Sequence, residues 1–165
     1  MDKRMSVRAC AARARLIFLS IALCTSLMLV RPAFGGLGDD ASSVQVDQLH
    51  FRGSLRTTHS DGYTVHEIES GNGIIVREYV SPSGKVFAVA WQGPWLPDMR
   101  QLLSTYFQQY QQAQQQQMNS HTGRKPLAIR QPGLVLQSGG HMRAFKGRAY
   151  IPDLLPAGVT PEEIQ

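Results

Sequence analysis

The chain has 165 residues, 17 lysines and arginines against 12 aspartates and glutamates, and a formal net charge of +5. This length suffices for one domain of ordinary size and not for two. With 42% hydrophobic and 18% charged residues, the composition excludes a wholly disordered polyelectrolyte, which would lack the apolar surface needed to offset the entropy of ordering.

The first 35 residues have the layout of a secretory signal peptide. A basic segment over residues 1–15 precedes an uncharged apolar run over 16–30, and a proline with small residues follows. Ala33 and Gly35 suit the −3 and −1 positions of a signal peptidase site. We therefore expect cleavage between Gly35 and Gly36, and export to the periplasm or out of the cell.

Two alternatives to cleavage remain. The apolar run could be an uncleaved membrane anchor, although it spans only about 22 Å as a helix against a hydrocarbon core of about 30 Å. Cys24 could be a lipidation site, although the bulky Leu23 before it argues against this.

Removal of the signal changes the charge balance. Six of the 17 basic residues and one of the 12 acidic residues lie within residues 1–35, so residues 36–165 hold 11 of each. A neutral mature domain loses the main argument for a nucleic-acid partner. Both cysteines, Cys10 and Cys24, lie in the signal as well, so the mature chain is expected to have neither a disulfide nor a cysteine ligand.

In the mature chain, residues 44–49 could form a short helix or an irregular arm. The clearest strand pattern covers 63–69, 74–80 and 85–91, which are rich in β-branched and aromatic residues and are joined by turn-forming linkers. We predict a three-stranded antiparallel meander over about 63–91. If both linkers are four-residue loops, Glu69 opposes Ile74 and Val80 opposes Lys85.

This register predicts one apolar face, which should pack on the core. The opposite face is mixed and holds Thr64, His66, Ile68, Arg77, Tyr79, Ala88 and Ala90. We expect His66, Arg77 and Tyr79 on this mixed face to form the binding surface.

Apolar residues at helical spacing predict one long helix over about 97–117, which ends in a segment with eight glutamines among ten residues, 108–117. Further short strands are expected within 127–150, with a tight turn at Ser138–His141. The fold class is therefore α+β, an antiparallel meander packed by one long helix. Residues 36–159 should form a single domain, and 160–165 a C-terminal tail.

Two segments carry a resemblance to a known family. Residues 76–103 and 137–159 read VREYVSPSGKVFAVAWQGPWLPDMRQLL and QSGGHMRAFKGRAYIPDLLPAGV. They resemble a family of small exported proteins of Gram-negative bacteria catalogued as domain of unknown function 2844, over about Leu37 to Val159. The resemblance implies export and a single domain. It implies no catalytic residues, because the family has no assigned activity.

Several residue sets could carry chemistry. His59 and His66 flank Asp61, but no pair among the five histidines has the spacing that places two imidazoles on one metal ion. Ser138 and His141, with Asp153, invite a hydrolase interpretation but lack the G-x-S-x-G elbow.

Carboxylates on the meander, Glu67, Glu69 and Glu78, could suggest a glycosidase pair. They are interpreted more simply as edge charges that discourage aggregation of strands. The cations Lys146 and Arg148 share one face of a strand, with Arg143 on the other, and could contact an anionic surface such as a headgroup or a polysaccharide.

The leading hypothesis is an exported, non-enzymatic binding or envelope-associated protein, with an unknown protein or envelope component as its partner. No catalytic residue, metal site, cofactor or nucleic-acid partner is indicated, and membrane contact is expected only through an uncleaved signal anchor. The alternative is a small periplasmic hydrolase or metal-dependent enzyme that uses His59, Asp61, His66 or His141.

The expected cleavage can be tested directly. Intact-mass spectrometry of the exported protein should find an N-terminus at or near Gly36, because the small residues before it suit the peptidase pocket. Recovery of a chain that still begins at Met1 from the cytoplasm would refute it.

Overall fold

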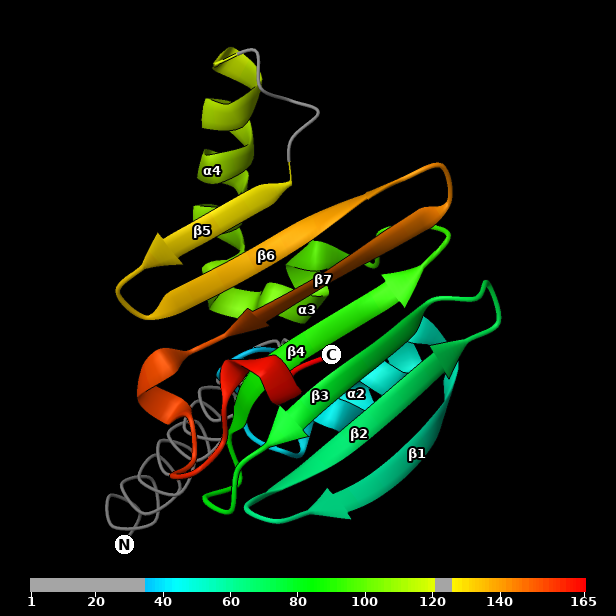
Figure 1. Ribbon diagram of the computed structural model, residues 1–165. Helices are drawn as coiled ribbons and strands as arrows, with labels where there is room; N and C mark the ends of the chain where they lie inside the picture. The colour runs from blue at the N-terminus through cyan, green and yellow to red at the C-terminus, as the bar shows by residue number, and fades with distance from the viewer. Residues whose placement is uncertain (1–34, 121–125) are drawn as a thin grey trace, which may run out of the picture. The chain divides into compact units, whose positions relative to one another are not determined.

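The computed structural model describes residues 35–120 and 126–165, which belong to a compact unit over Ala33–Gln165 (Figure 1). The predicted signal peptide, apart from Gly35, and the segment Gly123–Lys125 lie outside the described residues. Within the described part of the chain, no helix is long and apolar enough to cross a membrane.

One antiparallel sheet of seven strands organises the unit, in the order β1-β2-β3-β4-β7-β6-β5. The predicted α+β class is confirmed. The strands are β1 (Gly53–Ser60), β2 (Tyr63–Ser70), β3 (Ile75–Val80), β4 (Val86–Gly93), β5 (Leu127–Gln131), β6 (Leu134–His141) and β7 (Ala144–Tyr150). The helices are α2 (Ser43–Phe51), α3 (Met99–Leu103) and α4 (Phe107–Asn119), with short 3-10 turns at Ser104–Tyr106, Pro152–Leu154 and Pro161–Glu163.

The central strand β4 is buried on both faces. Every residue from Val86 to Trp91 is at most 2% exposed. Two apolar clusters result, one on each face of the sheet. We call the face covered by α2, α3 and α4 the first face. The C-terminal segment, residues 160–165, lies across the opposite or second face (Figure 1).

The predicted long helix is present but interrupted. Asp98 caps α3 by accepting hydrogen bonds from the backbone N–H groups of Arg100 and Gln101. Ser104 then adopts φ 47°, in the left-handed region, and the chain continues through a 3-10 turn into α4. The helices cover more of the sheet than the predicted meander. Helix α4 packs against β5, and α2 packs against β1 and β2.

The predicted register of the meander is wrong. Glu69 lies opposite Ile75, not Ile74, because Ile74 belongs to the turn, where its N–H donates to Asn72 Oδ1 at 3.2 Å. Between β3 and β4 the shift is two residues, so that Val76 opposes Trp91, with an irregularity at Tyr79/Val80. A one-residue slip exchanges the faces of a strand.

Four apolar residues therefore lie on the face opposite to the predicted one. The predicted register places Tyr63, Val65 and Phe87 on the apolar core face, and they pack instead in the second-face cluster with Tyr79. Ile68 was expected on the mixed face, and it is fully buried under the helices.

Two further local predictions need correction. Residues Ser138–His141 continue strand β6 and do not form the turn, which lies at Met142 and Arg143 with φ of 52° and 67°. Strand β1 was missed altogether, because the sequence GSLRTTHS has too few apolar residues to show a periodic pattern. It is an edge strand whose residues are largely exposed.

The packing between β4 and β7 requires a glycine at position 147. A β-carbon there would lie 2.3 Å from Trp91 Cζ2. Gly147→Ala should lower the free energy of unfolding by about 1–3 kcal/mol, because the close-packed indole must shift. Denaturant unfolding would measure this. Gly71→Ala is the matched control, since a β-carbon at Gly71 meets nothing within 4 Å; equal losses in both variants would contradict the explanation.

Candidate binding groove

The second face of the sheet carries a row of polar side chains across five strands. Register places Glu67, Arg77, Ala90, Arg148 and Gln137 opposite one another, from β2 through β3, β4 and β7 to β6. Opposed residues of an antiparallel sheet point to the same face. The small alanine at the centre of the row leaves room for the C-terminal segment.

The C-terminal segment is anchored to this row. Arg148 donates to the main-chain oxygens of Pro161 and Ile164, and its Nε donates to Gln137 Oε1 at 3.0 Å. Ile164 is 1% exposed and packs in the second-face cluster. The short turn before it begins at Thr160, whose N–H donates to Glu163 Oε1 at 2.9 Å and so lowers the pKa of that carboxyl.

The last residue completes the attachment. Tyr79 donates its O–H to the main-chain oxygen of Gln165 at 2.9 Å and accepts from the Gln165 N–H at 3.0 Å. Arg77 donates to the same oxygen at 3.1 Å. Residues 160–165, which the sequence suggested as a tail beyond the domain, thus cover part of the sheet.

The expected binding surface is split by these contacts. His66 lies opposite Glu78, on the helix-covered face, whereas Arg77 and Tyr79 lie on the second face. The three residues were grouped through the incorrect register, and they do not share one surface. Tyr79 is only 4% exposed because the C-terminal segment covers it, and this burial raises the pKa of its hydroxyl.

A groove of about 620 Å³ remains open beside the C-terminal segment, over β4, β7 and β6. Its lining includes Lys146 and Arg148, together with three glutamines, and contains no acidic side chain. Lys146 is exposed, and no carboxylate of the described chain lies within ion-pair distance of its ammonium. The lining residues are Trp91, Gln92, Pro126, Gln137, Ser138, Gly139, Gly140, Lys146, Gly147, Arg148, Ile164 and Gln165.

A second groove of about 510 Å³ lies on the other side of the C-terminal segment, over β1, β2 and β3. Its charges are internally paired. Arg77 Nε contacts Glu67 Oε2 at 2.7 Å, and Arg56 lies 3.8 Å from the other oxygen of that carboxylate. This groove therefore offers less unpaired charge to a ligand than the groove that contains Lys146.

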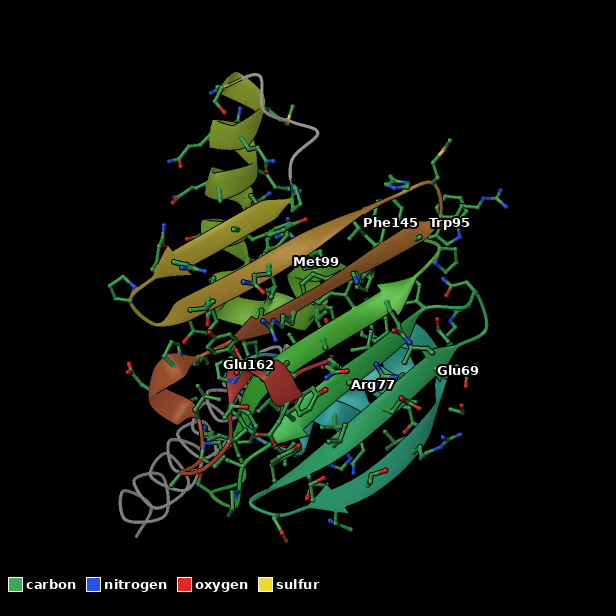
Figure 2. The ribbon with its side chains drawn as sticks, viewed as in Figure 1. Glu69, Arg77, Trp95, Met99, Phe145 and Glu162 are labelled. Carbon is green, nitrogen blue, oxygen red and sulfur yellow. The ribbon has the colours of Figure 1, made fainter. Side chains whose placement is uncertain are left out.

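An aromatic corner adjoins the Lys146 groove. Trp95 is 53% exposed, and the Arg143 guanidinium lies 5.6 Å from its ring centroid. Figure 2 shows Trp95 and Phe145 near each other where β7 begins. A shallow depression at this corner shares Gln92 and Lys146 with the groove. The depression thus joins the groove to Arg143, whose guanidinium contacts the exposed Trp95 indole.

Of the histidines in the alternative, enzymatic interpretation, His59 and His66 lie near each other, but His141 is remote from both. His59 contacts Thr64 Oγ1 at 3.1 Å, and His66 contacts Thr57 Oγ1 at 3.0 Å, between β1 and β2. Burial, with His59 nearby, lowers the pKa of His66. His141 lies on β6, five strand spacings from β1, or about 24 Å.

No metal-binding group assembles from these residues either. Within residues 35–120 and 126–165, no three His, Cys, Asp or Glu side chains gather closely enough to hold a metal ion. Asp61 lies in the exposed turn between β1 and β2, and Asp153 lies in the 3-10 turn after β7.

The sequence indicated part of this site. Alternation along residues 142–150 places Lys146 and Arg148 on one face, as the structure shows. The groove itself had no sequence signal, since it depends on which face the C-terminal segment covers and on the glycines of β6.

Attachment of the C-terminal segment through Tyr79 is testable. Tyr79→Phe should cost about 1 kcal/mol and speed hydrogen exchange at the Gln165 amide, because that N–H loses its acceptor. Exchange measured by mass spectrometry on the C-terminal peptide would report this. Tyr150→Phe on the same face is the control, since its hydroxyl has no hydrogen-bond partner among the described residues; unchanged exchange in Tyr79→Phe would contradict the assignment.

Comparison with known proteins identifies the family. A family model described as "Protein of unknown function (DUF2844)" matches residues 33–164. No curated protein and no solved structure matches the chain. The matched range contains the whole sheet, the helices that cover its first face, and all but the last residue of the C-terminal segment that covers its second. The chain therefore belongs to the DUF2844 family, as its resemblance over residues 76–103 and 137–159 indicated.

Proposed function

We propose that this protein is exported, to the periplasm or beyond, and acts by binding an anionic polysaccharide of the cell envelope in the Lys146 groove. Catalysis is not part of the proposed role. The export step rests on the signal-peptide pattern of residues 1–35.

The observation that carries the binding proposal is the lining of the groove. Two cations and three glutamines face a volume of about 620 Å³ with no acidic side chain among them. Amide groups donate to and accept from hydroxyls, and cations attract carboxylates or phosphates. The groove therefore suits a polymer that carries both hydroxyl groups and carboxylates or phosphates.

The exposed aromatic corner supports a sugar polymer in particular. The apolar C–H faces of sugar rings pack on an indole, and Trp95 offers an exposed indole beside Arg143, which lines the corner depression. The corner depression links Lys146 to Arg143, and the Arg143 guanidinium lies over the Trp95 ring. A chain of several sugars could therefore contact the indole and the cations together.

Binding can be measured by titration calorimetry with polygalacturonate as the anionic probe and dextran as the neutral one. We expect binding of polygalacturonate only, weakened by salt, because the charges are screened. Lys146→Gln should raise the Kd about three- to tenfold. Arg130→Gln is the matched control, since it removes one exposed positive charge from β5, outside the groove.

Equal losses in both variants would show a nonspecific charge effect and overturn the assignment of the groove. Failure to bind polygalacturonate, or equal affinity for dextran, would overturn the anionic polysaccharide as ligand. Binding to vesicles of phosphatidylglycerol but not to polygalacturonate would instead indicate a headgroup surface.

A further inference from the structure

A buried acidic cluster lies under the helices, away from the groove. Asp47 of α2 and Glu78 of β3 are both 0% exposed. Gln101 of α3 donates its Nε2 to Asp47 Oδ1 at 2.5 Å. Asp39, in the segment before α2, contributes a third, partly buried carboxyl that interacts electrostatically with both.

Acceptors in this cluster outnumber donors. Four buried carboxyl oxygens have no hydrogen-bond partner among the described residues: Asp39 Oδ2, Asp47 Oδ2 and both oxygens of Glu78. The Ser43 hydroxyl, which is also buried without a partner, can donate as well as accept. No lysine, arginine or histidine of the described chain forms an ion pair with Asp47 or Glu78. Unpaired buried carboxylates are costly, so such a concentration calls for a cationic donor.

Without a cation, the repulsion between the buried carboxylates is reduced only when one of them is protonated. Burial, together with the neighbouring Asp47, raises the pKa of Glu78 well above its usual range. Burial likewise raises the pKa of Asp47. A protonated Glu78 can donate one hydrogen bond to Asp47, which leaves the other oxygens without donors.

The predicted cleavage site lies against this cluster. A β-carbon on Gly35 would be 2.2 Å from Asp47 Oδ1. By standard bond lengths, the backbone nitrogen of Gly35 is then within about 5 Å of that oxygen, and the nitrogen of Gly36 within about 6 Å. Both glycines are buried, so the bond between them is accessible to a peptidase only before this segment packs.

The chain just after the cleavage site is held in place. The Leu37 N–H donates to Leu102 O at 3.0 Å, and the Asp39 N–H donates to Gly36 O at 3.1 Å. Gly36 has φ 112°, and a β-carbon there would lie 2.4 Å from Leu102 O. Cleavage would therefore leave Gly36 fixed beside the acidic cluster, with the space of Gly35 vacated.

We propose that the α-ammonium of Gly36, released by signal-peptide cleavage, binds Asp47 and Glu78, so that the buried acidic cluster is the docking site of the mature N-terminus. This inference rests on the proposed export. Water hydrolyses the Gly35–Gly36 bond: the carboxylate remains on Gly35, and the freed amine of Gly36 takes up a proton. The ammonium supplies one positive charge and three N–H donors to oxygens that lack them.

The ionisable groups around the ammonium come from three elements. They are Asp39 of its own segment, Asp47 and the nearby His50 of α2, and Glu78 of β3, whereas α3 contributes the neutral Gln101. The carboxylates favour the charged amine. Cleavage would thereby stabilise the fold, and the processed chain should be more stable than one whose terminus is displaced from the cluster.

The test uses protein exported and processed by the cell. Two serines inserted between Gly35 and Gly36 keep the residues before the cleaved bond but move the ammonium away from Asp47. We expect Tm to fall by about 5 °C or more in this variant. In an Asp47→Asn/Glu78→Gln background, the same insertion should change Tm little, because neutral amides do not require the cation.

A measurement without variants keeps the proposal testable if the double substitution fails to fold. NMR titration of the ¹⁵N-labelled Gly36 amine should give a pKa raised by about 1 or more above the ordinary value of about 8. An ordinary pKa, or an equal Tm with and without the insertion, would overturn the proposal. Intact mass separates the failures: Met1 retained refutes export, whereas a Gly36 terminus with an ordinary pKa refutes only the ammonium site.

Discussion

Burial of β4 on both faces is the constraint on which the rest of the structure depends. Six consecutive residues, from Val86 to Trp91, are excluded from water, so neither face of the sheet can be left to solvent. The helices cover one face and the C-terminal segment covers the other. Because the C-terminal segment is narrower than the sheet, an open groove lies on each side of it.

On each face of the sheet, a segment that covers it lies against a polar cluster. At the C-terminal end, Arg148 and Tyr79 satisfy main-chain groups of residues 161–165, so the polar row of the second face is partly consumed in holding the segment. In the segment before α2, Gly35, the last residue before the predicted cleavage site, lies against the carboxyl of Asp47. The proposed ligand groove uses what remains unpaired on the second face, above all Lys146.

Much of the fold could be predicted from the sequence, and the errors have identifiable physical causes. The three strands of the meander were found because β-branched residues and turn-forming linkers are local signals. The register failed because Asn72 draws Ile74 into the turn, a contact that strand periodicity does not show. The uninterrupted apolar run of β4 was assigned one core face, although such runs mark strands buried on both faces. The exposed edge strand β1 had no apolar pattern to detect.

By itself, the sequence determined the family, the α+β class, the strands of the meander and the charge balance, because these depend on composition and on patterns within a few residues of the chain. Only the tertiary structure decided which side chains share a surface. His66 lies on the face opposite to Arg77 and Tyr79, and the last six residues lie on the sheet. The groove beside Lys146 arises from segments as far apart as Trp91 and Gln165, and the acidic cluster from segments as far apart as Asp39 and Gln101. Long-range packing places such segments together, and no local pattern records it.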